Sequence, residues 1–509
     1  METIKATNPS TGEVIKEIHR TPPVEVEKTM KEAKLSFPSW RDLGVKKRIG
    51  YLTKMRKNLL DNLDGYSEII SRATGKSLTE SLMSDLLPTI DMIHYYEKNA
   101  KEFLSREKRK TPLAFQHCTS YVEYRPVGVV AIISPWNFPF QLSMVPVATA
   151  LVAGNTVVIK PSNVTPAVGE LIESIAIQIG LPQGVLTVVQ GGREVVQKMI
   201  EEKPEKIFFT GSVATGRKIM EQASKHLIPV ELELGGKDPM IILKDADVER
   251  AVEGALYGAF ANSGQICIGV ERVYVEEPVY EEFIKKLLKR VRELRLGEGK
   301  DVDLGAMTNP DQISVVKEQV EDAVQKGAVL HEPLRIEGNY VYPLIITNVD
   351  HTMKVMTEET FGPLMPVMAV KDEEEALMMA NDSIYGLNGS VWTKNIKKGK
   401  ALASRMESGN VMVNDVLKNV GNPDLPFGGV KQSGIGRYHG PEGIRSFTHS
   451  VSIMVNDNKA KKEVNWFPYT AEKYELVKGL LETLHGEMNP VTKGKELIKL
   501  MKKMKRMDD

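Results

Sequence analysis

The pattern of hydrophobic and polar positions divides the chain of 509 residues into blocks of different character. Residues 24 to about 107 carry long charged and amphipathic stretches, and their spacing predicts helices. From residue 127 onward, short apolar runs alternate with helical stretches at 167–179 and 216–225. This alternation, with nearly continuous apolar strands, predicts a parallel sheet covered by helices on both faces. Its strands are predicted at 127–134, 156–159, 185–189, 206–209 and 240–243.

A second α/β block follows residue 267, with strands predicted at 273–275 and 343–347. Helices are predicted between them, at 279–296 and 312–326. Residues 109–126 have a β-rich, alternating pattern and are predicted to form an extended arm. The fold class is therefore α/β, with more than one domain.

Composition removes several classes of function. Lys and Arg together number 67, as do Asp and Glu, so a net charge of zero gives no electrostatic case for a nucleic-acid partner. The longest apolar run, 127–133, is strand-sized, whereas a membrane span needs about 18–20 residues, and the first residues lack the apolar core of a secretory signal. Two cysteines cannot make a disulfide framework, and no Cys/His cluster predicts a metal site. We expect a cytoplasmic protein.

One of the two cysteines, Cys267, lies in the segment ANSGQICIGV (261–270). Free cysteine is among the most buried residue types and often acts as a small hydrophobe. A thiol that only fills the core needs no glycines beside it, whereas a nucleophile needs backbone that a substrate can approach. The segment by itself leaves both interpretations open.

Two stretches upstream place polar side chains at the ends of predicted strands. ISPWNFP (133–139) presents Asn137, whose carboxamide could donate to a developing oxyanion or satisfy a local turn. VVIKPSN (157–163) places Lys160 just past a strand, where open α/β sheets bind nucleotides. A solvated lysine at a strand end is the alternative.

Further stretches combine glycines with polar residues. FTGSVATG (209–216) suits a pyrophosphate at a helix N-terminus, but it lacks the G-x-G-x-x-G spacing and also fits a plain strand–helix turn. ELELGGKDP (231–239) contains Glu233 among apolar neighbours, where the pKa of a carboxylate could rise as a general base requires. A surface Glu at a strand end is the alternative. EETFGP (358–363) and LPFGGVKQSGIG (425–436) follow.

In this order and at these spacings, the motifs resemble those of the aldehyde dehydrogenase superfamily from about residue 5 to 455. They are WNFP, the FTGS loop, ELGGK, GQ-x-C with its Cys thirty-four residues after the Glu, E-x-FGP and PFGG-x-K-x-SG. The resemblance implies a Rossmann-like parallel-sheet cofactor domain (1–107 and 127–233) and an α/β catalytic domain (234–445). It also implies a β oligomerisation arm that pairs subunits into a homodimer or homotetramer (108–126 and 446–457), followed by a tail (458–509).

The resemblance also implies roles for three residues in aldehyde oxidation. Cys267 would be the nucleophile that attacks the aldehyde carbonyl, with the oxyanion held by the Asn137 carboxamide and the Cys267 backbone N–H. Transfer of hydride to the nicotinamide would leave a thioester, and Glu233 would activate the water that hydrolyses it. The branch that passes its thioester to coenzyme A generally lacks this Glu, so hydrolysis is expected here.

The cofactor expected from the resemblance is NAD or NADP. Glu359 matches the residue that bonds the nicotinamide ribose, Phe361 the one beside the nicotinamide, and Ser212 the expected place of the pyrophosphate. In the motif that contains Lys160, many members of the family carry a Glu three residues after the Lys, where it repels the 2′-phosphate of NADP. This chain has Asn163 there, which predicts that NADP is accepted. The remaining matched cofactor positions are Trp136, Lys160, Ser162 and Gly211.

The substrate is predicted from position 145, eight residues after Asn137. Succinate-semialdehyde dehydrogenases place an Arg there and betaine-aldehyde enzymes a Trp, whereas this chain has Val145. An apolar pocket would favour an aliphatic or aromatic aldehyde. The alternative is a semialdehyde dehydrogenase that acts on a charged substrate. The predicted pocket residues are Phe138, Leu142, Val145, Ile266, Ile268 and Phe427.

Another alternative is a structural or binding protein that has lost catalysis, against which the intact Asn137, Glu233 and Cys267 argue. The tail leaves its own question open. NWFPY (465–469) resembles the segment that closes the fatty-aldehyde branch, and Lys493–Arg506 mixes seven Lys and Arg residues with apolar ones. Such a basic amphipathic helix could make peripheral contact with an anionic membrane, or could dock on the protein or a neighbouring subunit. An apolar stripe precedes it at Leu476, Val477, Leu480, Leu481 and Leu484.

Overall fold

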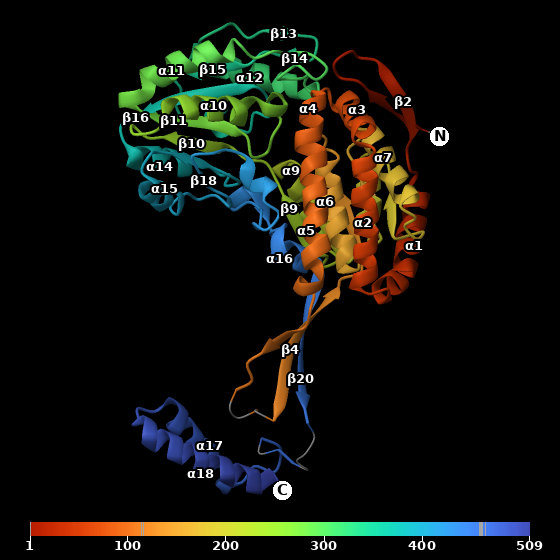
Figure 1. Cartoon of the computed structure of the whole chain (residues 1–509), viewed down its shortest axis with the longest axis vertical. Coiled ribbons are helices and arrows are strands. Elements are labelled where there is room, and N and C mark those ends of the chain that lie inside the picture. Colours follow the sequence, from red (N-terminus) through yellow and green to blue (C-terminus); the bar gives the residue numbers. More distant parts are fainter. Residues whose placement is uncertain (1, 113–114, 116, 458–461, 464, 509) are drawn as a thin grey trace. The chain divides into compact units, whose positions relative to one another are not determined.

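The structure is a computed structural model that describes residues 2–112, 115, 117–457, 462–463 and 465–508. It contains two compact units, Met1–Ser105 with Tyr124–Ser450, and Arg106–Glu123 with Val451–Asp509. Figure 1 shows the elements of each unit. The described part contains no helix long and apolar enough to cross a membrane.

The first sheet of the larger unit has the strand order β19-β9-β8-β5-β6-β7. Five of its strands, β5 to β9, are parallel to one another. The sixth, β19 (Gly434–Ile435), pairs antiparallel with β9. Strand β19 comes from far along the chain, so the first sheet is completed by a segment that follows the strands of the second sheet. The parallel strands are β5 (Val129–Ile133), β6 (Thr156–Lys160), β7 (Leu186–Val188), β8 (Lys206–Thr210) and β9 (Val230–Glu233).

Helices cover both faces of this sheet, which explains why β5 is apolar at every position. In β5, Val130 and Ile132 belong to one buried cluster, with side chains of helices α2, α5 and α6. Val129, Ala131 and Ile133 belong to another, with side chains of α1, α8 and α9. The helices of this part are α1 (Pro23–Asp42), α2 (Val45–Asp61), α3 (Leu63–Thr74), α4 (Leu78–Glu80), a π-helical stretch (Ser81–Leu86), α5 (Leu87–Phe103), α6 (Gln141–Ala153), α7 (Pro166–Gln178), α8 (Arg193–Glu201) and α9 (Val213–Ser224).

The second sheet has the order β12-β15-β16-β11-β10-β17-β18. The strand predicted at 240–243 is β10, so it belongs to this sheet and not to the first one. The strands are β10 (Asp238–Ile242), β11 (Val270–Glu276), β12 (Val329–Leu330), β15 (Leu344–Thr347), β16 (Leu364–Val370), β17 (Ser390–Trp392) and β18 (Met412–Val413). Around them lie α10 (Val248–Phe260), α11 (Glu277–Val291), α12 (Asp311–Gln325), α13 (Lys354–Thr357), α14 (Glu373–Asn381) and α15 (Ile396–Ala403), whereas α16 (Gly440–Ser446) packs against α5 and α6.

The helix predicted at 279–296 ends earlier, at Val291. The physical reason is local, because the Arg295 N–H donates to the Asp303 carboxylate at 2.8 Å and the chain turns there. The turn-rich start of the chain forms a hairpin, and a second small hairpin lies beyond α12. These hairpins are β1 (Thr3–Thr7) with β2 (Val14–His19), and β13 (Ile336–Glu337) with β14 (Tyr340–Val341).

The segments predicted as an arm form a three-stranded sheet of β3 (Glu107–Arg109), β4 (Cys118–Pro126) and β20 (Thr448–Asn456), in the order β20-β4-β3. The tail forms a helical hairpin of α17 (Ala471–His485) and α18 (Pro490–Asp508). Gly479 leaves room for Leu500 at their contact, since a Cβ on Gly479 would lie 3.3 Å from it. The apolar stripe of α17 is divided, because Leu476 is buried whereas Val477 and Leu481 are exposed.

Candidate active site

Cys267 lies on a loop that carries unusual backbone geometry. Between α10 and β11, Asn262, Ser263 and Gly264 all have positive φ, at 49°, 54° and 75°. The Ser263 hydroxyl donates to the Gly305 carbonyl at 2.7 Å, which holds the turn. Any Cβ on Gly264 would lie 2.2 Å from the Gly362 carbonyl, so only glycine permits the E-x-FGP loop to approach. The small residues before Cys267 therefore bring two distant motifs into contact.

Asn137 lies between the end of β5 and the start of α6 and is 2% exposed. Its Nδ2 donates to the Gln265 carbonyl at 3.0 Å, two residues before the nucleophile candidate. The Gln265 side chain in turn donates to the Asn262 carbonyl at 2.8 Å and accepts from the Thr308 N–H at 2.8 Å. The carboxamide of Asn137 is thus tied directly to the loop of Cys267.

A cavity of about 160 Å³ brings together motifs from both sheets. It is lined by all three residues that the sequence predicts for the chemistry, together with five predicted cofactor residues and two predicted pocket residues. These are Asn137, Glu233 and Cys267; Trp136, Gly211, Ser212, Glu359 and Phe361; and Leu142 and Phe427. Thr210 also lines the cavity and was missed although it belongs to the FTGS motif, whereas Gln312, Leu387 and Tyr438 line it from segments in which the sequence analysis found no motif.

Four predicted pocket residues do not line this cavity. The Phe138 ring lies 4.2 Å from the Lys76 ammonium, and Val145 is buried inside α6 with 1% exposure. Ile266 and Ile268 are 6% and 4% exposed and belong to the apolar core. All four side chains belong to the apolar core cluster, and their spacing from Asn137 and Cys267 along the chain does not reveal this packing.

Three predicted cofactor residues lie at the end of β6, outside the cavity. The Lys160 ammonium donates to the Asn163 carboxamide oxygen at 3.3 Å and to the Gly191 carbonyl at 3.1 Å. Burial lowers the pKa of Lys160 to about 8, with Glu194 acting in the opposite direction. The Ser162 hydroxyl accepts from the Val164 N–H at 3.2 Å and fixes the turn. Lys160 and Asn163 therefore present a cation and an amide side by side.

The electrostatics of the cavity favour neutral forms of its acidic groups. Glu233 is 5% exposed, and neither carboxylate oxygen has a hydrogen-bond partner in the described part of the chain. Burial, and then the neighbouring Glu231, hold the pKa of Glu233 well above its usual value. Burial also raises the pKa of the Cys267 thiol, with further contributions from Glu359, Asp238 and Glu233. A carboxylate whose pKa is raised is a stronger base once it is ionised, so Glu233 is a candidate general base in the cavity that Cys267 also lines.

The E-x-FGP loop forms the opposite wall of the cavity. Glu359 accepts from the Gly236 N–H at 3.0 Å, and burial raises its pKa to about 8. Phe361 has a φ of 51°, and its ring lies edge-on to Trp136 with centroids 5.5 Å apart. The Glu271 carboxylate accepts from the Thr360 N–H at 2.7 Å and from the Phe361 N–H at 3.1 Å. This holds the strained aromatic residue at the mouth of the cavity.

These features fit a dinucleotide. Ser212 caps α9 by accepting from the Thr215 N–H at 3.3 Å. The positive end of this helix therefore lies at the Gly211–Ser212 turn, and both residues of the turn line the cavity. A Cβ on Gly235 would lie 2.3 Å from a Glu359 carboxylate oxygen, so this loop is shaped for close approach. An aromatic pair and a carboxylate at one end, and a helix N-terminus at the other, match a nicotinamide ribose and a pyrophosphate.

Comparisons with known proteins give the same family that the sequence motifs resemble. A sequence model described as the aldehyde dehydrogenase family matches residues 1–453. A 4,4'-diapolycopene aldehyde oxidase of Methylomonas sp is 46% identical over 496 residues, 97% of this chain and 94% of that protein. A glutarate-semialdehyde dehydrogenase of Pseudomonas putida is 35% identical over 465 residues, 89% of this chain and 95% of that protein. The crystal structure of betaine aldehyde dehydrogenase from Staphylococcus aureus in complex with NAD+ has a TM-score of 0.86 and 31% identity, and the match covers 92% of this chain and 94% of that one.

The chain therefore belongs to the aldehyde dehydrogenase family. It is an NAD(P)-dependent aldehyde dehydrogenase, and the α/β fold that the motifs predicted is confirmed by the solved relatives. The prediction of aldehyde oxidation is confirmed at this level.

Proposed function

We propose that the enzyme oxidises an apolar aldehyde to the carboxylic acid, with Cys267 as nucleophile, Asn137 as oxyanion donor and Glu233 as base. The convergence of these three side chains on one cavity is the observation that carries the proposal. Support for an apolar substrate comes from the relative named as a diapolycopene aldehyde oxidase.

The chemistry assigned to the chain's own residues is as follows. The Cys267 sulfur reacts as the thiolate and bonds to the aldehyde carbon, and the oxyanion that forms is held by the Asn137 carboxamide and the Cys267 N–H. Bound NAD(P)+ supplies the acceptor for the hydride that leaves this carbon, and a thioester remains on Cys267. Glu233 then takes a proton from a water whose oxygen attacks the acyl carbon, and the carbon–sulfur bond breaks to release the acid and the thiolate.

The lining of the cavity argues against a substrate with a carboxylate tail. Among the described residues that line it, none is Lys or Arg, whereas Glu233 and Glu359 are both present. The carboxylate tail of a semialdehyde would enter without a positive partner and would lie near two acidic side chains, which is unfavourable in a buried site. Leu142, Leu387 and Phe427 offer apolar surface instead. The semialdehyde alternative is therefore disfavoured.

The proposal for the cofactor rests on Asn163 and Lys160. A carboxylate at position 163 would repel a 2′-phosphate, and the carboxamide removes this repulsion. The Lys160 ammonium lies 3.3 Å from the Asn163 oxygen and, with a pKa of about 8, is mostly charged at neutral pH. NADP+ is thus accepted, and we propose that it is preferred over NAD+.

Steady-state kinetics over an aldehyde panel with both cofactors tests these proposals. We expect kcat/KM for hexanal and benzaldehyde to exceed that for succinate semialdehyde by about tenfold or more, because an unpaired carboxylate is penalised. With the best aldehyde, kcat/KM should be higher for NADP+ than for NAD+, and Asn163→Glu should reverse this order. A higher value for succinate semialdehyde contradicts the apolar pocket, and an equal or higher value for NAD+ contradicts the preference.

We further propose that the helical hairpin of α17 and α18 contacts the surface of an anionic membrane. Tyr474, Val477 and Leu481 are exposed at i, i+3 and i+7, so they share one face of α17. Exposed Val491 and Ile498 share a face of α18. Lysines of α18 and exposed aromatic residues add the charge and the amphipathic rings that suit a lipid interface; they are Lys495, Lys499 and Lys502, with Trp466, Phe467 and Tyr469.

The comparisons support this proposal indirectly. The alignment with the diapolycopene aldehyde oxidase covers 97% of the chain and necessarily extends into the tail, which lies beyond the residues matched by the family model. The alignment with the glutarate-semialdehyde dehydrogenase covers only 89% of the chain. The tail is thus aligned, at least in part, with the relative that is named for an apolar aldehyde.

Flotation with lipid vesicles tests the hairpin. The full-length protein is expected to float with vesicles that contain phosphatidylglycerol and much less with pure phosphatidylcholine. Lys495→Glu with Lys499→Glu should lower binding by more than about tenfold, since each basic residue near an anionic surface contributes about 1 kcal/mol. Lys394→Glu with Lys397→Glu, which changes the same charge at exposed positions of the larger unit, should have no comparable effect. Equal flotation of the two double variants would contradict the proposal and favour docking on protein.

A further inference from the structure

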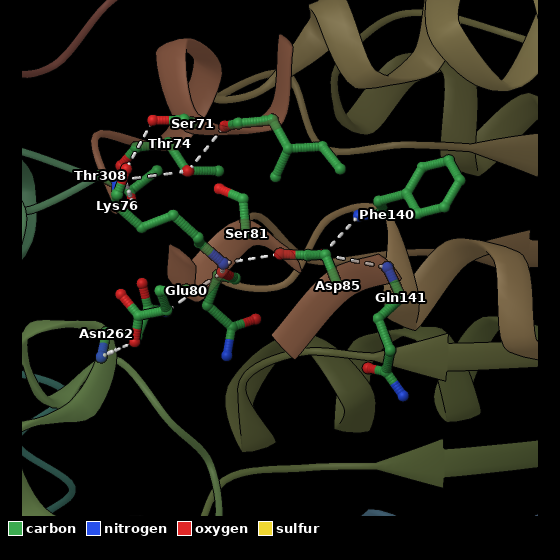
Figure 2. A network of polar contacts seen from close by, with 12 residues as sticks. Ser71, Thr74, Lys76, Glu80, Ser81, Asp85, Phe140, Gln141, Asn262 and Thr308 are labelled. Carbon is green, nitrogen blue, oxygen red and sulfur yellow. Dashed lines mark hydrogen bonds and ion pairs between the residues drawn. The ribbon is translucent and has the colours of Figure 1, made fainter. Parts of the chain in front are cut away.

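A charged pair lies buried beneath the loop that carries Asn137. Lys76 is 2% exposed and Asp85 is fully buried, and the Lys76 Nζ lies 2.8 Å from Asp85 Oδ2. Figure 2 shows this pair in a network of polar contacts in which Asp85 contacts the start of α6 and Glu80 contacts Asn262. Desolvation of two charges often costs as much as their attraction gains, so a buried pair is weak support for stability alone. Its position calls for another explanation.

The Lys76 ammonium donates two hydrogen bonds, one of them to Asn137 itself. The first is donated to Asp85, and the second to the backbone carbonyl of Asn137 at 2.8 Å. The ammonium also lies 4.2 Å from the centre of the Phe138 ring, within the range of a cation–π contact. Lys76 thus holds both the residue whose side chain lines the cavity and the residue that follows it.

Asp85 holds the other end of the same loop. Its second carboxylate oxygen accepts from the Phe140 and Gln141 N–H groups, each at 3.1 Å, at the point where α6 begins. Asp85 lies in the π-helical stretch Ser81–Leu86, and such stretches occur frequently at functional sites. Lys76 and Asp85 together therefore hold the loop from Asn137 to Gln141 at both ends.

The carbonyl of Asn137 has a second donor, from the loop of the nucleophile. Asn262 Nδ2 donates to it at 3.1 Å, and the Asn262 N–H donates to the Glu80 carboxylate. A carbonyl has two acceptor positions, so these two bonds account for the hydrogen-bonding capacity of the Asn137 backbone oxygen. Its position is therefore set jointly by Lys76 and by the turn that leads to Cys267.

We propose that Lys76, paired with Asp85, is a positioning residue that holds the Asn137 carboxamide at the place where the oxyanion forms. The inference rests on the proposed role of Asn137 as oxyanion donor. Oxyanion donors act only when they are preorganised, and a displacement of about 1 Å can cost about a hundredfold in rate. Lys76 is not among the residues that line the cavity, whereas Asn137 is. Lys76 donates to the Asn137 carbonyl, so its effect on the reaction passes through Asn137.

A double-mutant cycle between Lys76→Met and Asn137→Ala tests the inference. Lys76→Met should lower kcat by about thirtyfold in the wild-type background, with KM for NADP+ changed by less than about twofold, because the cofactor contacts are untouched. In the Asn137→Ala background the same substitution should lower kcat by less than about threefold, since no carboxamide remains to be positioned. Thermal unfolding is measured for every variant, and assays are run well below the lowest Tm.

Two further variants separate positioning from folding. Lys76→Met with Asp85→Asn removes both charges and retains an acceptor for the α6 N–H groups, so it should fold and show the same loss of kcat if Lys76→Met alone does not fold. Arg48→Met is the matched control, because Arg48 is also a buried cation but donates to the carbonyls of Arg41 and Val152, away from Asn137. It should lower Tm and leave kcat nearly unchanged.

The outcomes distinguish the two proposals. Equal losses from Lys76→Met in both backgrounds, or a loss of kcat in Arg48→Met as large as in Lys76→Met, would overturn the positioning role. Full activity of Asn137→Ala would instead overturn the oxyanion role on which the inference rests.

Discussion

Replacing Cys267 by serine is expected to lower kcat by at least about a thousandfold, because the weaker nucleophile cannot form the thioester that the reaction passes through. The cavity around it should be retained, since serine differs from cysteine by one atom. Binding of NADP+, followed by quenching of tryptophan fluorescence, should therefore stay within about threefold of wild type. The measurement is NADPH formation at saturating aldehyde.

The chain contains its own matched control. Cys118, the other of the two cysteines, lies half-buried on β4 in the smaller unit. Cys118→Ser makes the same chemical change and should leave kcat within about twofold of wild type. Loss of activity in Cys118→Ser, or substantial turnover in Cys267→Ser, would refute the assignment of the nucleophile. Absence of aldehyde turnover in the wild type as well would instead support the alternative of a binding protein.

Replacing Glu233 by glutamine should lower steady-state turnover by about a hundredfold or more, the range of a lost general base. Hydride transfer precedes the step that Glu233 assists, so the variant should still form about one NADPH per active site in a burst. Acylated Cys267 should then accumulate and be visible by intact-protein mass spectrometry. This result would separate the hydrolytic step from the attack of the thiol.

The pH dependence of kcat provides a second measurement. Burial holds the pKa values of Glu233 and Cys267 above their usual ranges, so the base and thiolate forms become more populated as pH rises. Activity of the wild type should therefore increase from neutral to alkaline pH. In Glu233→Gln the part of this increase that belongs to hydrolysis should disappear. A variant without a burst, or with wild-type turnover, would contradict the role of Glu233.

Much of the architecture was predictable because it depends on local pattern. Strands such as β5 are apolar at every position, since Val130 and Ile132 face one helical layer while Val129 and Ala131 face the other. The partner of a strand is not a local property. The strand predicted at 240–243 was grouped with the first sheet, whereas it pairs with β11 and β17 in the second.

The candidate site was predictable to the extent that its motifs recur together. Asn137, Glu233, Cys267 and the Glu359–Phe361 loop meet at one cavity, as their order along the chain suggested. The wall facing the substrate was not predictable from neighbours in sequence. Phe138 turns toward Lys76, and Ile266 and Ile268 turn into the core, whereas Leu387 and Tyr438 arrive from distant segments.

The sequence by itself determined the α/β class, the reaction and the three residues proposed to carry it, because apolar periodicity and motif spacing are written along the chain. Only the tertiary structure decided what surrounds those residues. The raised pKa of Glu233 comes from burial and from Glu231, and the position of Asn137 depends on Lys76 and Asp85, which precede it by more than fifty residues. Desolvation and hydrogen bonding depend on which atoms meet in space, and that is settled only when the chain is folded.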